Sequence, residues 1–214
     1  VIAVTSGPGL APALRAGVQT AKTLAWLWQK PLVPVCHLEG HIYAAWLGET
    51  KPIFPALCLI VSGGHTELVL MTDHGQFKRL GETLDDASGE AFDKVAKMLG
   101  LPYPGGPHLA KLAVAGDRRA YNFPRAMLGN GDHNFSFSGL KTAVLYALKK
   151  DPEAIKADVA ASFEQTVIDI LIGKTIHAVS EYQPQSIILA GGVAANLELR
   201  LQLKLAAENS GVSL

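Results

Sequence analysis

The chain has 214 residues, of which 49% are hydrophobic and 18% charged, so it can bury a sizeable core and is not a disordered chain. Its 19 basic and 19 acidic residues balance, which neither indicates a polyanion partner nor excludes a local basic patch. Its two cysteines, Cys36 and Cys58, exclude a disulfide framework, and the absence of a long apolar run predicts a soluble, cytoplasmic protein with no membrane partner.

The N-terminal quarter alternates between strands and helices. VIAVTS (1–6) is short, apolar and β-branched and predicts a buried strand, followed by the turn GPGLAP. Apolar residues at helical spacing predict a helix over 14–30, and PLVPV (31–35) predicts a second strand. The stretch 37–47 is then expected to be a helix.

Three strands are predicted next. Residues 56–73 hold two strand-like runs around SGGH, which is typical of a hairpin with a glycine turn, and QFKRLGETLD predicts the third strand. Helices are expected over 85–100, after PGGP (104–107), after FSFSG (135–139), over 152–183 and over 193–211. SIILAGG (186–192) and the final VSL (212–214) predict two more strands.

Two stretches share the plan strand, glycine turn, helix, strand: one over 1–35 and one over 186–214. This similarity indicates a structural duplication. The second copy is preceded by three strands and a long helix, whereas the first has nothing before it. We therefore expect an interior piece of a longer protein, with residues 1–55 forming half of one lobe and residues 56–214 the other lobe.

The stretch CHLEGH places His37 and His41 four residues apart, on one face of a helix, where two imidazoles can bind one metal ion. The alternative is two helix histidines that are exposed or hydrogen-bonded. Glu39 lies two positions after His37, which turns it away from that face and disfavours the HExxH type of metalloprotease.

Three glycine turns could bring backbone amides close to an anion: SGGHT (62–66), PGGP (104–107) and GGVAAN (191–196). Each has an ordinary alternative, a tight hairpin turn or a turn from strand to helix. The acidic residues of DDASGEAFDKVAK are expected mostly to be solvated or to favour the helix dipole. The sequence contains no Walker loop, no GxGxxG and no GxSxG elbow.

Six segments in this order resemble one family: AVTSGPGLAPALRAG, PVCHLEGHIYAAWL, LCLIVSGGHTELV, LGETLDDASGEAFDKVAKMLGLPYPGGP, FSFSGLKTA and LAGGVAANLELR. It is the family of tRNA threonylcarbamoyladenosine transferases, called TsaD in bacteria and formerly labelled an O-sialoglycoprotein endopeptidase. The segments cover nearly the whole chain. The resemblance implies the α/β fold of actin, sugar kinases and heat-shock ATPases, with two duplicated lobes around a cleft.

The resemblance also implies an acyl transfer. The family moves a threonylcarbamoyl group from threonylcarbamoyl-adenylate to N6 of the adenosine 3′ to the anticodon, in tRNAs that read codons beginning with A, and releases AMP. Bacterial members act with a same-fold scaffold subunit (TsaB-like) and a small ATPase (TsaE-like). No residue is expected to be a covalent nucleophile.

Site residues carry over by position. His37 and His41 resemble the ligands of a divalent metal ion, iron (Fe²⁺) first and zinc as the alternative. The positions that resemble the adenylate-binding residues are Ile60, Val61, Ser62, Gly63, Gly64, Asp93, Gly106 and Asn196. The family's acidic first-strand motif and its third metal ligand, an aspartate after GGVAANLELR, are absent from this sequence, and position 110, acidic in some relatives, is Ala110.

Three competing functions remain. A non-catalytic scaffold relative would lack the histidine pair, which is present here. A small-molecule kinase or ATPase of the same fold would have no need of His37 and His41. The protease function is disfavoured by the position of Glu39.

Overall fold

The structure, a computed structural model, describes residues 1–48 and 51–214. The chain divides into two compact units, Val1–Lys51 (unit 1) and Pro52–Leu214 (unit 2). We expected the division between residues 55 and 56. Each unit is described by itself.

Unit 1 is a strand–helix–strand unit followed by a short helix. Strands β1 (Ile2–Gly7) and β2 (Leu32–Cys36) pair in parallel, and α1 (Ala11–Leu27) connects them. Helix α2 (His37–Tyr43) follows β2 directly and continues into a 3-10 turn, η1 (Ala44–Leu47). These are the four elements that the sequence predicts.

Helix α1 is displaced by three residues from the predicted 14–30. It begins earlier because Pro12 lies in its first turn, where a proline costs no hydrogen bond. It ends at Leu27, and Gln29 has a φ of +50°, outside the right-handed helical range. The prediction followed apolar spacing alone and did not use Pro12 as a start signal.

Unit 2 is built on a four-stranded mixed sheet in the order β5-β4-β3-β6. Strands β3 (Ala56–Val61), β4 (Thr66–Asp73) and β5 (Gln76–Glu82) run antiparallel, as expected for a hairpin and a third strand. Strand β6 (Ser186–Ala190) pairs in parallel with β3. A parallel neighbour requires a crossover, and the helices between β5 and β6 provide it.

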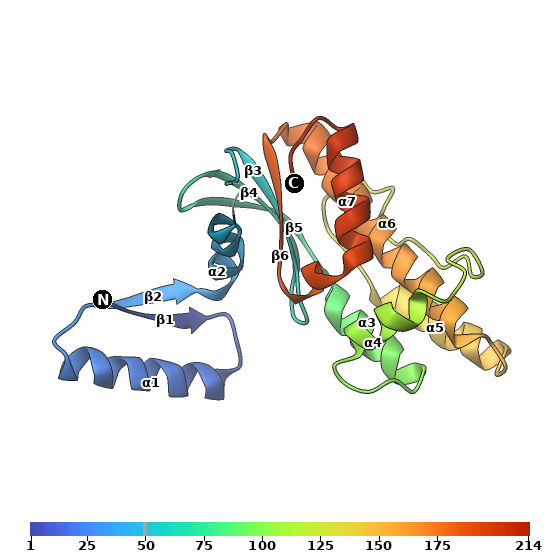
Figure 1. Cartoon of the computed structure of the whole chain (residues 1–214), viewed down its shortest axis with the longest axis horizontal. Helices are drawn as coiled ribbons and strands as arrows, with labels where there is room; N and C mark the ends of the chain where they lie inside the picture. The colour runs from blue at the N-terminus through green and yellow to red at the C-terminus, as the bar shows by residue number, and fades with distance from the viewer. Residues whose placement is uncertain (49–50) are drawn as a thin grey trace. The chain divides into compact units, whose positions relative to one another are not determined.

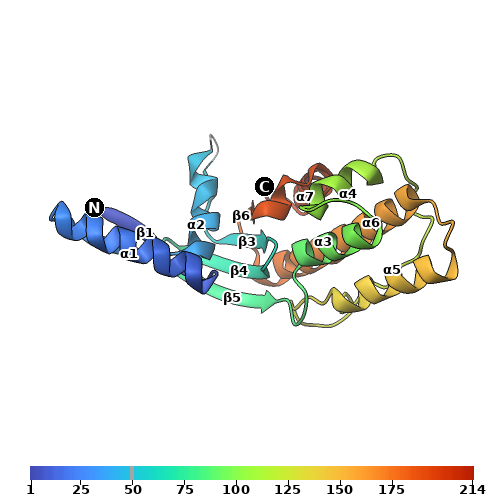
Figure 2. The ribbon, with the colours of Figure 1, turned by 90° about the horizontal axis from the view of Figure 1, so that it is seen from below.

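The helices of unit 2 lie on the same side of this sheet in two perpendicular views (Figures 1 and 2). They are α3 (Ser88–Met98), α4 (Gly105–Ala113), α5 (Ser138–Lys150), α6 (Lys156–Tyr182), the 3-10 turn η2 (Gly192–Ala195) and α7 (Leu197–Asn209). Alternate residues of β3, Leu57, Leu59 and Val61, belong to the same buried cluster as Phe92 of α3 and Phe163 of α6. None of the helices within 1–48 and 51–214 is long and apolar enough to cross a membrane.

The repeated plan is present in the topology. As β1 and β2 are parallel neighbours joined by α1, so the chain after α7 returns beside β6 in parallel. The strand expected to begin at VSL is represented by a single parallel bridge between Ser213 and Ser186.

Candidate functional site

The histidine pair of unit 1 lies on one face of α2, one turn apart. The Nε2 atoms of His37 and His41 are 3.1 Å apart and their ring centroids 4.4 Å. Helix α2 begins at His37 because β2 ends at Cys36 in an extended conformation. His37 is exposed and His41 half-buried, so both rings are reachable from solvent.

The spacing of the two nitrogens fits two ligands of one ion. Imidazole nitrogens bonded to a metal at about 2.0 to 2.1 Å lie about 3.3 Å apart at a tetrahedral angle and about 2.9 Å apart at a right angle. The observed 3.1 Å lies between these values, and it is also an ordinary N–H···N hydrogen bond. Among the described residues no cluster of three or more His, Cys, Asp or Glu could hold a metal ion, so unit 1 offers two ligands.

In unit 2, the turn between β3 and β4 is built around Ser62. Its Oγ accepts the backbone amides of His65 at 3.0 Å and Gly64 at 3.4 Å, and its own amide donates to His65 O at 2.8 Å. The amide of Gly63 donates no hydrogen bond within the described part of the chain. The turn is therefore a tight hairpin that leaves one exposed amide for an anion.

Helix α3 begins against this turn. The amide of Gly89 donates to Ser62 O at 3.2 Å, and a Cβ at Gly89 would lie 2.6 Å from that oxygen. Thr66 Oγ1 accepts the amide of Ser88 at 2.8 Å, which fixes the start of the helix to β4. The DDASGE motif thus needs glycine at 89 for close packing of backbone on backbone.

The two acids at the head of this motif are structural. Asp85 accepts the amides of Phe137 and Ser138 at 2.8 and 3.2 Å at the start of α5. Asp86 accepts the ammonium groups of Lys94 at 2.6 Å and Lys141 at 2.9 Å. We expected most of these carboxylates to be solvated or to favour the dipole, and both instead join distant segments.

Asp93 lies on α3, and its carboxylate caps the next helix. Oδ1 accepts the amides of Gly105 at 2.7 Å and Gly106 at 3.3 Å, at the start of α4. A Cβ at Gly105 would lie 2.4 Å from Ala96 Cβ, whereas one at Gly106 would lie 3.9 Å from Phe92. The steric requirement for glycine in PGGP therefore falls on Gly105.

Asn196 caps α7, as the ordinary alternative for GGVAAN predicts. Its Oδ1 accepts the amide of Leu199 at 2.9 Å, and its Nδ2 donates to Glu164 Oε1 at 2.7 Å. Gly191 has a φ of +95°, and a Cβ there would lie 2.3 Å from Val61 O. The ends of β6 and β3 therefore meet closely enough to place the two glycine turns side by side.

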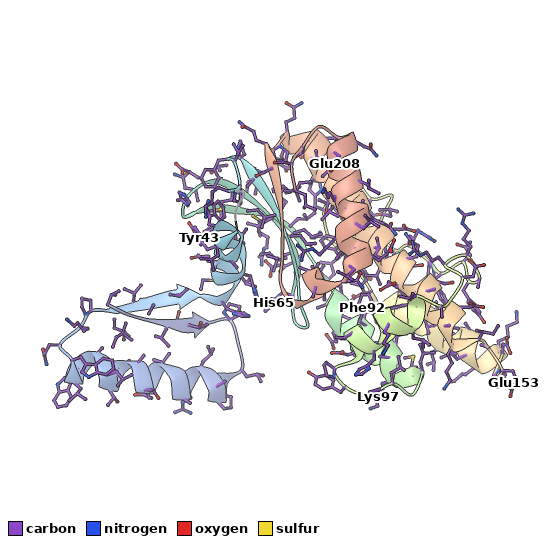
Figure 3. The ribbon with its side chains drawn as sticks, in the orientation of Figure 1. Tyr43, His65, Phe92, Lys97, Glu153 and Glu208 are labelled. Atoms are coloured by element: carbon purple, nitrogen blue, oxygen red, sulfur yellow. The ribbon has the colours of Figure 1, made fainter. Side chains whose placement is uncertain are left out.

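These elements enclose a pocket of about 680 Å³ in unit 2, within the range of small-molecule sites. Four of the residues expected to bind the adenylate line it: Gly63, Asp93, Gly106 and Asn196. Figure 3 labels Phe92, which lines the pocket from α3, and Lys97 farther along the same helix, away from it.

The other expected residues of β3 and its turn are placed differently. Ile60 and Val61 are 1% and 0% exposed and belong to the sheet interior. Ser62 and Gly64 flank Gly63 in the turn without lining the pocket. His37 and His41 belong to unit 1.

Four charged residues that line the pocket were not predicted. Arg118 Nη1 lies 2.6 Å from Glu198 Oε1, and Lys111 makes no ion pair within the described residues. Glu164 is 7% exposed, and burial raises the pKa of its carboxyl group. Burial also acts to raise the pKa of Glu198, but the hydrogen bonds from Gln202 and Arg118 outweigh it, so that pKa is lowered. Glu164 follows the apolar run VAASF, a signal that was available in the sequence.

Two solved structures are similar in fold. A crystal structure of HypF from T. kodakarensis matches with a TM-score of 0.74 at 14% identity, over 99% of this chain and 37% of that one. Full-length HypF in its phosphate- and nucleotide-bound form matches with a TM-score of 0.74 at 16% identity, over 99% of this chain and 42% of that one. At these identities the likeness concerns the fold alone. The fold is of the predicted α/β class, that of actin, sugar kinases and heat-shock ATPases.

The family is defined by the sequence. The chain belongs to the TsaD family, tRNA N6-adenosine threonylcarbamoyltransferase, whose model matches residues 1–214. It is 54% identical to the tRNA N6-adenosine threonylcarbamoyltransferase of Bacillus subtilis (strain 168), over all of this chain and 62% of that protein. The enzyme of the same name from Moorella thermoacetica is also 54% identical, over 99% of this chain and 63% of that protein. The chain thus spans less than two thirds of these relatives.

Proposed function

We propose that the complete protein transfers the threonylcarbamoyl group from threonylcarbamoyl-adenylate to N6 of the adenosine 3′ to the anticodon, in tRNAs that read codons beginning with A. The amine would form a bond to the carbamoyl carbon, the bond from that carbon to the phosphate oxygen would break, and AMP and a proton would leave. The observation that carries the proposal is the pocket in which Gly63, Asp93, Gly106 and Asn196 converge, in a chain of this family.

The pocket offers hydrogen-bond donors to one part of the nucleotide and an acceptor to another. The free amide of Gly63, with Gly192 at the start of η2, offers backbone donors to the phosphate, where negative charge grows as AMP leaves. Asp93 is an acceptor and suits the ribose hydroxyls. With no covalent nucleophile, the chain would act by positioning and by stabilising charge.

The histidine pair is the proposed site of a divalent ion, iron or zinc. His37 and His41 would supply two imidazole ligands at the observed spacing. A bound ion would contribute Lewis-acid polarisation of the carbamoyl-phosphate oxygens. The two histidines would fix its position through the rigid turn of α2.

The partners are proposed on the same basis. Since the related enzymes are named for tRNA, a tRNA is the expected acceptor, and the cytoplasm the expected compartment. A TsaB-like subunit of the same fold and a TsaE-like ATPase are the expected companions. The balance of charge in this chain is consistent with a tRNA surface shared among subunits.

The test is transfer of radiolabelled threonylcarbamoyl to tRNA by the complete gene product with its partner subunits. Asp93→Ala is expected to abolish most transfer, because it removes an acceptor from the pocket. Lys97→Ala, on the same helix but outside the pocket, is the matched control and should transfer normally. Label in tRNA that is absent with the parent protein, or equal in parent and Asp93→Ala, would reject the proposal.

A further inference from the structure

Glu164 is an acid in the buried face of α6. The neighbouring Phe163 and Val167 are 0% exposed, and Glu164 itself is 7% exposed. A carboxylate in such surroundings costs free energy unless its oxygens have partners. Its side chain lines the pocket, so a bound ligand can supply a hydrogen-bond donor that the protein does not.

One oxygen of this carboxylate is satisfied and the other is not. Oε1 accepts Nδ2 of Asn196 at 2.7 Å, and within the described residues Oε2 accepts no hydrogen bond. The nearby guanidinium of Arg118 is taken by Glu198 at 2.6 Å. Among the described residues, Nδ1 of His133 is the one fully buried side-chain nitrogen or oxygen without a hydrogen-bond partner. Since Oε2 of Glu164 also has no partner, it is not fully buried, and it faces the pocket that Glu164 lines.

Several of the residues that line the pocket with Glu164 are apolar. Helices α4 and α7 both pack against α6. The pocket is lined by Pro107 and Ala110 of α4, by Val114 directly after it, by Ala195 of η2 and by Leu197 of α7. The side chain of Phe92 adds an aromatic surface. Apolar walls beside an open acceptor suit a flat ring whose edge carries a hydrogen-bond donor.

We propose that Glu164 is the specificity-determining residue for the base, its Oε2 accepting a hydrogen bond from the 6-amino group of adenine in the slot between α4 and α7. The inference rests on the proposed function, which supplies an adenylate as the ligand. A 6-oxo purine would place a carbonyl oxygen against the carboxylate, two acceptors facing each other. The slot therefore rejects hypoxanthine and guanine.

The test compares AMP with IMP, which differ at this edge of the base, by calorimetric titration of the complete gene product. The parent is expected to bind AMP about tenfold more tightly than IMP, or more. Glu164→Gln keeps an acceptor for Asn196 and turns the atom facing the pocket into a donor, so its preference should vanish or reverse. Glu153→Gln, at an exposed site outside the pocket, is the matched control and should keep the parent's preference.

A loss of the AMP preference in Glu164→Gln would not be explained by unfolding of the variant. Since Glu164→Gln removes a buried charge, its melting temperature at neutral pH should equal or exceed that of the parent. An AMP-to-IMP ratio equal in parent and Glu164→Gln would overturn the inference and leave the proposed function standing. A variant that loses the distinction between AMP and 2′-deoxy-AMP instead would assign Glu164 to the ribose and equally overturn it. If the parent binds neither nucleotide, the adenylate pocket and the proposed function fail together.

Discussion

The carboxylate of Asp93 on α3 holds the backbone of Gly105 at the start of α4, with Oδ1 2.7 Å from the amide nitrogen. The same oxygen accepts the amide of Gly106 at 3.3 Å. One side chain thus satisfies two amides that a helix start leaves without partners, and it joins two walls of the pocket.

Replacing Asp93 should therefore affect stability and ligand binding together. Asp93→Ala is expected to destabilise the protein by about 1 to 2 kcal/mol, the usual cost of a lost helix cap, and to weaken AMP binding. Denaturant unfolding and AMP titration measure the two effects. Asp93→Asn keeps an acceptor oxygen and should recover most of the stability. Equal stability of parent and Asp93→Ala would show that the cap contributes nothing.

Close packing at Gly89 gives a second prediction. Gly89→Ala would place a methyl group 2.6 Å from Ser62 O, a backbone atom that cannot move without moving the turn. We expect a loss of about 1 to 3 kcal/mol and weaker nucleotide binding, because α3 must move away from the glycine turn. Gly139→Ala, where a Cβ meets nothing within 4 Å, is the control. A Gly89→Ala melting temperature equal to that of Gly139→Ala would contradict the packing.

Asp86 makes part of the stability dependent on pH. Burial acts to raise its pKa, but the hydrogen bonds from Lys94 and Lys141 outweigh burial and hold the pKa below the ordinary 3.8. Stability from a lowered carboxyl pKa is fully present above the unfolded value, near 3.8, and is lost as pH falls through the folded value.

Asp86→Asn tests this dependence. At pH 7 the variant should be less stable than the parent by about 2 kcal/mol, because two charge-assisted hydrogen bonds are weakened. The difference should shrink as pH falls below the unfolded value near 3.8, where Asp86 takes up a proton in the unfolded parent before it does so in the folded parent. Unfolding curves at pH 7 and pH 3 measure it. A difference that stays constant or widens toward acid pH would refute this role of Asp86.

The histidine pair predicts the metal content. Elemental analysis of the complete gene product, purified without chelator, is expected to find about one iron or zinc per chain, and none in His37→Ala, because one imidazole of the pair is removed. His108→Ala, an exposed histidine of α4, should keep the metal. Metal retained by His37→Ala would exclude the pair as ligands.

What the sequence could predict depends on the range of the interactions. The helix that carries His37 and the glycine turn at Gly63 follow from local spacing, and both were predicted. Glu164 follows an apolar run that indicates burial, but its partner Asn196 lies 32 residues away on another element, so its place in the pocket could not be predicted. In PGGP the resemblance pointed to Gly106, but the contact with Ala96 that requires a glycine falls at Gly105, which only packing reveals.

The most direct test of the central claim is a crystal structure of the complete gene product with AMP. The account predicts a nucleotide in the pocket of unit 2, its phosphate at Gly63, its ribose at Asp93 and its base beside Glu164 between α4 and α7. A nucleotide bound elsewhere on the protein, or an empty pocket at saturating AMP, would contradict it.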